Sequence, residues 1–335
     1  MKRQRTLKNS FTLEGKGLHT GLNLKISLNP APENYGYKIR RTDILGQPII
    51  DALAEKVVHT QRGTVLSDNG IQVGTVEHVL AALYGCEIDN CMIEIDGPEF
   101  PILDGSSIIY VSKIKEVGVE EQDATRKYIH FKRKRIRVTD PETGSEMILL
   151  PGDSLRIQSK IKFNSLLLKQ QDACLNDLSE FIREFASSRT FVFVREIEHL
   201  LKNDLIKGGD LDNAIVIYDT PLSQEAYDKL ADLTGVKYKD AKKLGYIMNK
   251  PLIHENEPAR HKVLDILGDI ALTGGFIKGT IIANCPGHKI NTLFAQAIRN
   301  QYIAETSKKR KTVKEKELHL QPALSGVASF YWSKP

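Results

Sequence analysis

The residues best suited to hydrolytic chemistry are an adjacent Glu77-His78 pair and a His261-Asp265 pair four residues apart. In a helix, residues i and i+4 project from the same side, so His261 and Asp265 can share one metal ion. A catalytic zinc site ordinarily takes three protein ligands and leaves a position for water, and His78 could be the third ligand. Glu77 beside it supplies a carboxylate base. We therefore predict a metal hydrolase site assembled from both halves of the chain.

The second pair belongs to a predicted amphipathic helix that begins near Arg260. One stripe of this helix carries His261, Asp265, Gly268 and Asp269. The opposite face is apolar and carries Val263, Leu264, Ile266, Leu267 and Ile270. A polar stripe alone indicates a wet helix face, and a lone histidine such as His78 is more often structural. Short Asp, His and Gly side chains in place of long Lys and Glu nevertheless favour a site close to the backbone.

Two further histidines lie in turn-rich sequence. His288 follows Pro-Gly in "CPGHKIN", after a predicted strand, where loop residues commonly reach an active site. A surface loop histidine explains this position equally well. His19 lies between glycines in "GLHTG", a turn that could approach a ligand.

The elements that must position these residues are short strands and two helices. Alternating segments predict strands at about residues 22–30, 35–43 and 91–97, and one helix interrupts them from Thr75 to about Tyr84. The helix near Arg260 is followed by a strand in "KGTIIANC". Each half thus has a His-bearing helix, a strand and a Gly/Pro loop. This parallel indicates a duplicated α+β unit.

The length of 335 residues, with 41% hydrophobic and 27% charged residues, is sufficient for two cores. We predict a first α+β domain at 1–126 and a second at 127–304, divided near the charged "EVGVEEQDATRK". A βαβ-like pattern predicts an insert at about 190–220. The basic tail at 305–335 receives no predicted role.

Composition also limits the partners. The chain has no apolar signal region at its start and no run of about 18 apolar residues, so we expect a cytoplasmic protein without a membrane span. Its four cysteines form no CxxC pair, which favours free thiols. The net charge of +5 is concentrated at Lys132–Arg137 and Lys308–Lys311. We interpret these runs as a solvated strand face and a frayed tail, and we expect no nucleic-acid partner. Peripheral contact with an anionic membrane stays open.

Seven motifs in order make the sequence recognisable. They are "GKGLHTG", "NPAPENYGYKIRRTD", "TVEHVLAALYGCEIDNCMIEIDGPEFPILDGS", "SSRTFVFVREIEHL", "KGGDLDNAIV", "ARHKVLDILGDI" and "GHKIN". Over roughly residues 7 to 300 the chain resembles the zinc-dependent UDP-3-O-acyl-N-acetylglucosamine deacetylases, which make lipid A for the Gram-negative outer membrane. The resemblance implies an α+β fold of two similar domains, layered as sheet, helices and sheet, each with a small insert. The active site would lie between them.

The resemblance also implies roles for individual residues. The metal ligands would be His78, His261 and Asp265, holding Zn²⁺, although Fe²⁺ suits the same donors. In the hydrolysis of the N-acetyl group, Glu77 would be the general base, His288 the general acid, Asp269 its orienting partner and Thr190 a hydroxyl beside the oxyanion. Lys262 would contact the substrate. Acetate and the free amino sugar would be the products of this committed step.

Other substrate contacts are less defined. The insert would form a passage for the 3-O-acyl chain, lined by Phe191, Ile197, Leu200 and Ile215, whose alternative role is to pack the insert. Phe163 is a candidate for stacking on uracil and is otherwise a core strand residue. Cys285 and Pro286 replace a basic residue common in the family near the diphosphate. We expect a monomer. A zinc amidase of the same fold acting on another N-acyl sugar is the main rival, and a basic nucleic-acid-binding protein is a remote one.

Overall fold

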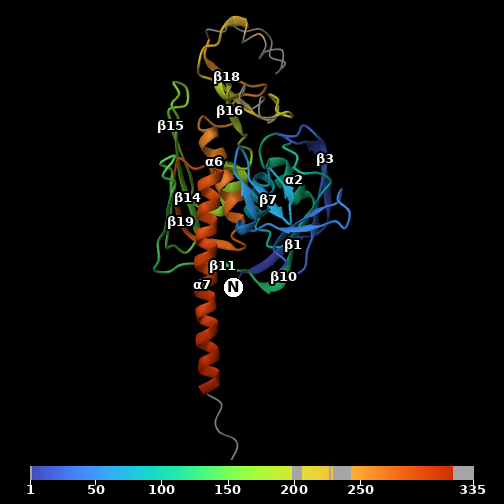
Figure 1. The fold of residues 1–335 in the computed structure, drawn as a ribbon, viewed down its shortest axis with the longest axis vertical. Helices are drawn as coiled ribbons and strands as arrows, with labels where there is room; N and C mark the ends of the chain where they lie inside the picture. Colours follow the sequence, from blue (N-terminus) through green and yellow to red (C-terminus); the bar gives the residue numbers. More distant parts are fainter. Residues whose placement is uncertain (1, 198–205, 226–227, 229–242, 320–335) are drawn as a thin grey trace, which may run out of the picture.

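Two five-stranded sheets of the same topology form the outer layers of the protein (Figure 1). The computed structural model describes all residues except 1, 198–205, 226–227, 229–242 and 320–335. The first sheet has the order β2-β3-β9-β4-β5, with bounds Phe11–Lys16, Asn23–Pro30, Cys91–Ile95, Tyr37–Arg41 and Ile49–Asp51. The second has the order β12-β13-β19-β14-β15, with bounds Ile136–Thr139, Glu146–Leu150, Phe276–Asn284, Leu155–Lys162 and Gln170–Leu175. A sixth strand, β11 (Tyr128–His130), pairs in parallel with β19.

The two sheets repeat each other strand for strand. In the first, β4 pairs in parallel with β9 and all other pairs are antiparallel. In the second, β14 pairs in parallel with β19 in the same way, and the other pairs on the five-strand path are antiparallel. Strand β14 alternates strictly between buried and exposed residues, as expected of a strand with one face on the core. The predicted α+β fold of two similar halves is confirmed.

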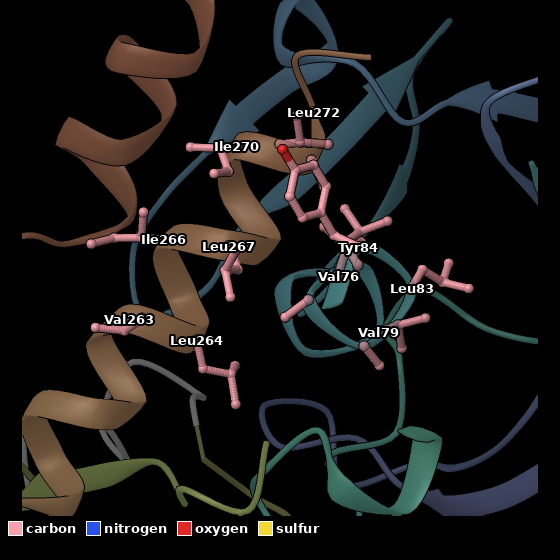
Figure 2. Close-up of a cluster of buried hydrophobic side chains, with 14 of the residues drawn as sticks. Val76, Val79, Leu83, Tyr84, Val263, Leu264, Ile266, Leu267, Ile270 and Leu272 are labelled. Carbon is pink, nitrogen blue, oxygen red and sulfur yellow. The ribbon is translucent and has the colours of Figure 1, made fainter. Parts of the chain in front are cut away.

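The helices α1 (Glu77–Gly85) and α6 (Glu257–Ala271) lie between the sheets. All nine residues of α1 and thirteen of the fifteen in α6 are buried. Figure 2 shows Leu264 and Leu267 on the side of α6 that faces α1, and the Tyr84 ring of α1 beside Leu272 at the end of α6. The polar stripe of α6, which carries His261, Asp265, Gly268 and Asp269, is also buried, because it faces α1 instead of water. A helix buried on all sides carries polar residues only where they have partners.

Smaller sheets complete each half. The first insert is β6-β7-β8, with bounds Val57–His59, Val65–Asp68 and Ile71–Val73. The second is β16-β17-β18, with bounds Phe191–Phe193, Ile215–Tyr218 and Gly245–Ile247. Strands β16 and β17 are parallel, as a βαβ connection requires. The remaining short elements are the 3₁₀ helices Ala54–Lys56 and Leu178–Glu180 and the helix α3 (Phe181–Glu184).

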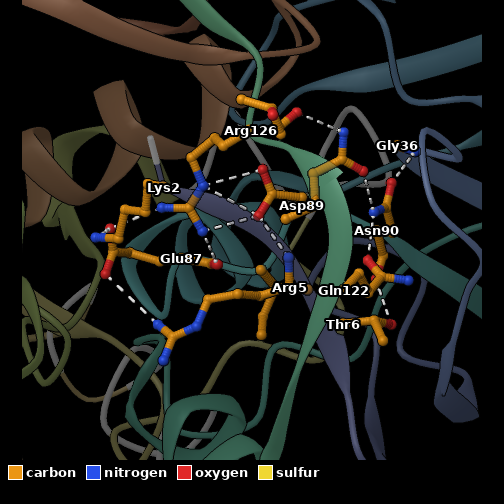
Figure 3. A network of polar contacts seen from close by, with 12 residues as sticks. Lys2, Arg5, Thr6, Gly36, Glu87, Asp89, Asn90, Gln122 and Arg126 are labelled. Atoms are coloured by element: carbon orange, nitrogen blue, oxygen red, sulfur yellow. Dashed lines mark hydrogen bonds and ion pairs between the residues drawn. The ribbon is translucent and has the colours of Figure 1, made fainter.

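The junction of the two halves is held by a polar network (Figure 3). Strand β1 (Arg3–Leu7) pairs with β10 (Val119–Thr125), which leads directly to Arg126. The Arg126 guanidinium is fully buried, pairs with Asp89 and Glu87 at 2.8 Å and lies 4.2 Å from the ring centre of Phe276. Arg126 therefore contacts residues from both halves of the sequence: Glu87 and Asp89 precede it, and Phe276 follows it. The predicted domain limits stay a prediction.

Two helices differ from expectation. Helix α2 (Ile108–Val117) was not predicted. Helix α7 (His288–His319) begins at His288, so this histidine is not a loop residue. Residues 305–319 of the predicted tail continue α7, and the Lys308–Lys311 run is therefore helical and not frayed. Among the described residues, no helix is long and apolar enough to cross a membrane.

Candidate active site

Glu77 and His78 are the first two residues of α1, and the Glu77 backbone lies against Gly268 of α6. A Cβ atom at Gly268 would lie 2.1 Å from the Glu77 carbonyl oxygen, so only glycine permits this helix crossing. The crossing brings the start of α1 beside His261 and Asp265. Residues more than 180 positions apart in the sequence thereby share one site.

Three side chains form a compact set of metal-ligating atoms. One ligand atom each of His78, His261 and Asp265 lies within 4.8 Å of the others, and all three residues are buried. Asp265 Oδ1 lies 3.3 Å from His261 Nε2 and 4.0 Å from His78 Nε2, yet it accepts no hydrogen bond from any described residue. A buried carboxylate oxygen without a donor calls for a cation. The residues present therefore fit a divalent metal ion.

The surroundings hold these ligands in the protonation states that a metal requires. His261 Nδ1 lies 2.9 Å from the Ser188 carbonyl oxygen, which fixes the ring with Nε2 toward Asp265. Burial, reinforced by His261, lowers the pKa of His78 to about 3, and burial also lowers the pKa of His261. Burial would raise the pKa of Asp265, but His261 and Lys262 hold it below its usual value. Neutral imidazoles and an ionised carboxylate are the forms that bind metal.

Ser188 is in turn held by a buried ion pair. Arg189 donates from its backbone N and its Nε to Glu257, at 3.0 and 2.8 Å. Glu257 is the first residue of α6, so this pair fixes the segment carrying Ser188 and Thr190 against the helix that carries His261. Arg189 lies within the quoted "SSRTFVFVREIEHL" motif, but nothing in the sequence distinguished it as a partner of Glu257.

Glu77 and His288, the predicted base and acid, lie beside the His78, His261 and Asp265 cluster. His288 Nε2 lies 4.0 Å from Glu77 Oε1, and His288 Nδ1 lies 3.1 Å from Asp269 Oδ2. Burial raises the pKa of Glu77 to about 7. Burial would lower the pKa of His288, but Asp269, Asp265 and Glu77 outweigh it and raise that pKa to about 9. Near neutral pH the pair can therefore hold an unprotonated carboxylate opposite a protonated imidazole.

A family model described as LpxC, UDP-3-O-acyl N-acetylglycosamine deacetylase, matches residues 4–232 and 239–300. The chain belongs to the LpxC family. A bifunctional enzyme LpxC/FabZ of Porphyromonas gingivalis is 56% identical over 301 residues, 90% of this chain and 65% of that protein. A UDP-3-O-acyl-N-acetylglucosamine deacetylase of Shewanella woodyi is 36% identical over 305 residues, 90% of this chain and 91% of that protein. The match thus covers less than two thirds of the bifunctional relative.

The LpxC-type site opens into a cavity of about 360 Å³. Glu77, the three ligand residues, His288, Thr190, Phe191 and Lys262 all line it, together with the apolar residues Leu18, Ile102 and Ile290. Lys262 Nζ donates to Asp265 Oδ2 at 2.7 Å and lies 5.4 Å from the centre of the Phe191 ring. Most of the predicted catalytic and metal residues therefore meet at one cavity, and Asp269 lies behind it.

Other predicted substrate contacts lie outside the cavity lining. Phe163 packs against Phe191 and Phe193, with ring centres 5.7 and 5.1 Å apart. Ile215 is fully buried in the main core, and Ile197 belongs to a separate small core of the insert. Leu200 lies outside the described residues. The acyl and uracil roles of these residues stay predictions.

The loop around His19 forms one wall between the cavity and the insert. The buried Glu99 carboxylate accepts hydrogen bonds from the backbone N of His19 and of Thr20, both at 2.9 Å. Leu18 in the same loop lines the cavity, and its carbonyl accepts a hydrogen bond of 3.0 Å from Gly208 N of the insert. His19 itself is half-buried and does not line the cavity. Its predicted ligand contact stays untested.

Residues on both sides of His288 in the sequence also line the cavity. Cys285 lines it in a left-handed backbone conformation, with φ of 52°, and Lys289 lines it from the first turn of α7. Lys289 pairs with Asp140 at 3.3 Å and with Glu142. The family's basic residue N-terminal to His288 is replaced here by Cys285 and Pro286. Lys289, which follows His288, instead places a basic group on this side of the cavity.

Thr64 is a further residue in contact with the predicted site residues that the sequence did not single out. It lies fully buried between β6 and β7, and it contacts Glu77, Asp269 and His288. Asn291, also buried, donates to Asp269 Oδ2 at 2.9 Å. Asn291 ends the quoted "GHKIN" motif, three residues after His288, whereas Thr64 lies outside the quoted motifs and no local signal in the sequence distinguishes it.

Proposed function

We propose that this protein hydrolyses the N-acetyl group of UDP-3-O-acyl-N-acetylglucosamine to give UDP-3-O-acyl-glucosamine and acetate, a step of lipid A biosynthesis. The observation that carries the proposal is the convergence of His78, His261 and Asp265 with the Glu77-His288 pair at one cavity. The deacetylase named among the relatives supports the choice of substrate. A monomeric cytoplasmic enzyme is part of this proposal.

The metal proposed for the three ligands is zinc. When bound there, Zn²⁺ supplies Lewis-acid polarisation of the amide carbonyl and lowers the pKa of water. The one carboxylate and two imidazoles also suit Fe²⁺. The rest of the chemistry falls to the side chains of this chain.

Glu77 takes a proton from the attacking water, because its carboxylate faces the cavity and lies beside the ligand set. The Thr190 hydroxyl lines the same cavity and donates to the oxyanion that develops on the amide oxygen. Protonated His288 gives the Nε2 proton to the departing nitrogen, since an amine leaves poorly unless it is protonated. Asp269 keeps the imidazole charged and oriented from the Nδ1 side.

The substrate assignment predicts a steep dependence on acyl length. Each methylene removed from the 3-O-acyl chain should lower kcat/KM by roughly fourfold, because burying a methylene is worth about 0.8 kcal/mol. The measurement is kcat/KM over a series of acyl lengths, with UDP-N-acetylglucosamine as the non-acylated limit. A flat dependence would favour the rival amidase that acts on another N-acyl sugar.

A variant sharpens this experiment. Ile197 is packed inside the insert, so enlarging it would disturb folding. Leu18→Trp instead places bulk at the cavity edge beside the insert, and it should impair long-chain substrates more than short-chain ones. Leu45→Trp is the matched control, because Leu45 is fully exposed.

The acid and base predict a bell-shaped pH dependence of kcat/KM. Activity needs Glu77 unprotonated, so it should fall as the pH drops through the pKa of Glu77, which is about 7 without metal. Activity needs His288 protonated, so it should fall again as the pH rises through the pKa of His288, about 9 without metal. A bound cation disfavours protons on both groups and moves both limbs to lower pH. Replacement of His288 by glutamine should remove the basic limb, and persistence of that limb would contradict the assignment.

A further inference from the structure

Thr64 contacts Glu77 through its main chain and Asp269, the partner of His288, through its side chain. Its backbone N–H donates to Glu77 Oε2 at 3.0 Å. Its side-chain hydroxyl donates to Asp269 Oδ1 at 2.6 Å. Thr64 is fully buried, so water cannot replace either contact.

The direction of these hydrogen bonds follows from the chemistry of the groups. An ionised carboxylate only accepts hydrogen bonds, so the Thr64 hydroxyl is the donor in its hydrogen bond with Asp269. A lone pair of the same hydroxyl remains, and His288 Nδ1 lies 3.3 Å from it. The Nδ1–H of a protonated His288 thus lies between two acceptors, Thr64 Oγ1 and Asp269 Oδ2 at 3.1 Å.

This arrangement fixes the imidazole on its rear side. Asn291 donates to Asp269 Oδ2 at 2.9 Å while Thr64 holds Oδ1, so the Asp269 carboxylate cannot rotate freely. With Nδ1 held, Nε2 of His288 remains directed to the cavity, 4.0 Å from Glu77 Oε1. Proton transfer at Nε2 depends on this placement.

The backbone around Thr64 is tied to the same helix. Val76 N, directly before Glu77, lies 3.4 Å from the Thr64 carbonyl oxygen and donates to it. The preceding Gly63 is buried, and a Cβ there would lie 3.3 Å from Glu77 Oε1. The chain can therefore pass close enough to α1 for Thr64 to reach the Glu77 carboxylate.

We propose that Thr64 is a positioning residue that links the general base to the general acid. Its main chain orients Glu77, and its hydroxyl orients the Asp269-His288 pair. This inference rests on the proposed function for its kinetic consequence, but the hydrogen bonds themselves can be tested without any substrate.

The decisive comparison is Thr64→Val against Thr64→Ser. Valine keeps the size, the β-branch and the backbone N–H, and it removes only the hydroxyl. We expect Thr64→Val to lower kcat by about 10- to 100-fold, the effect of losing a buried hydrogen bond to a charged group, with KM changed by less than about threefold. Thr64→Ser retains the hydroxyl and should stay within about threefold of the wild type in kcat. Thr12→Val, on the exposed side of β2, is the matched control.

A second readout does not depend on turnover. In the metal-loaded protein, the Nδ1–H proton of His288 should give a slowly exchanging downfield NMR resonance in the wild type and in Thr64→Ser, and this resonance should broaden or vanish in Thr64→Val. Metal content and melting temperature of the variants should show that the fold and the ligand set are intact.

Three outcomes would overturn the inference. The first is a Thr64→Val enzyme with wild-type kcat and an unchanged Nδ1–H resonance. The second is an equal loss in the valine and serine variants, which would mean that Thr64 only packs. The third is a valine variant that loses metal, which would place Thr64 with the ligand set. If the wild type fails to deacetylate any acylated substrate, the proposed function fails, and the resonance alone decides the role of Thr64.

Discussion

Replacing His261 by alanine should remove the metal and abolish deacetylation. The variant leaves His78 and Asp265 as the only members of the ligand set, and two ligands do not make a catalytic zinc site. It also leaves the Ser188 carbonyl without its imidazole partner. Metal content per chain, measured by elemental analysis after dialysis, should fall from one to near zero, with loss of turnover.

The control for this experiment is His59→Ala, since His59 is exposed on β6 and has no place in the site. That protein should keep both its metal and its activity. Full metal content together with full turnover in His261→Ala would show that the ligand assignment is wrong.

Replacing Glu77 by glutamine should lower kcat/KM by about 10²-fold or more, because the base that takes the proton from water is lost. Glutamine has nearly the same shape and can still accept the hydrogen bond from Thr64 N, so the start of α1 should not move. Glu77 is not in the ligand set, and the metal should remain bound. Retained metal with lost activity therefore distinguishes a base from a ligand.

Metal content and a pre-steady-state assay, measured on the same set of variants, would show whether Glu77 acts as a general base or as a metal ligand. Glu94→Gln is a suitable control, because Glu94 on β9 pairs with Arg40 at the surface and lies in another part of the first sheet. Wild-type turnover in Glu77→Gln would exclude Glu77 as the base.

Local patterns in the sequence were sufficient to predict which three side chains the structure brings together as a possible metal site, His78, His261 and Asp265. The i, i+4 spacing of His261 and Asp265 specifies a shared helix face, and the adjacent Glu77-His78 pair marks the start of another helix. Roles for Asp269, Thr190 and Lys262 came from the resemblance to a family. The cavity brings Thr190 and Lys262 together with the ligands, but their roles stay proposals.

The spacing of polar and apolar residues in α6 could not show whether its polar stripe faces water or another part of the protein. The stripe on α6 contacts a second helix, and amphipathic spacing is the same whether the polar face meets water or a partner. Gly268 was the informative residue, because its missing side chain permits the contact with Glu77. Composition likewise misled at the end of the chain, where a Lys-rich segment forms the last turns of α7.

Tertiary contacts between distant residues were beyond prediction from one sequence. Thr64 and Asp269 are separated by 205 positions, and neither spacing nor residue type links them. The start of α7 at His288 was missed because Pro286 and Gly287 read as a turn, and both residues are also common just before a helix. Helix and loop histidines cannot be distinguished at such a boundary.

The close crossing of α1 and α6 also bears on the order in which the protein folds and binds metal during its synthesis. During synthesis, the chain emerges from its N-terminus, so His78 is available long before His261 and Asp265 have been made. A folding intermediate with only the first half formed would offer one imidazole, too few donors to retain a metal ion. If the three residues hold a metal ion as proposed, we expect its uptake to follow the docking of the second half through Gly268, so that bound metal would report a completed tertiary structure.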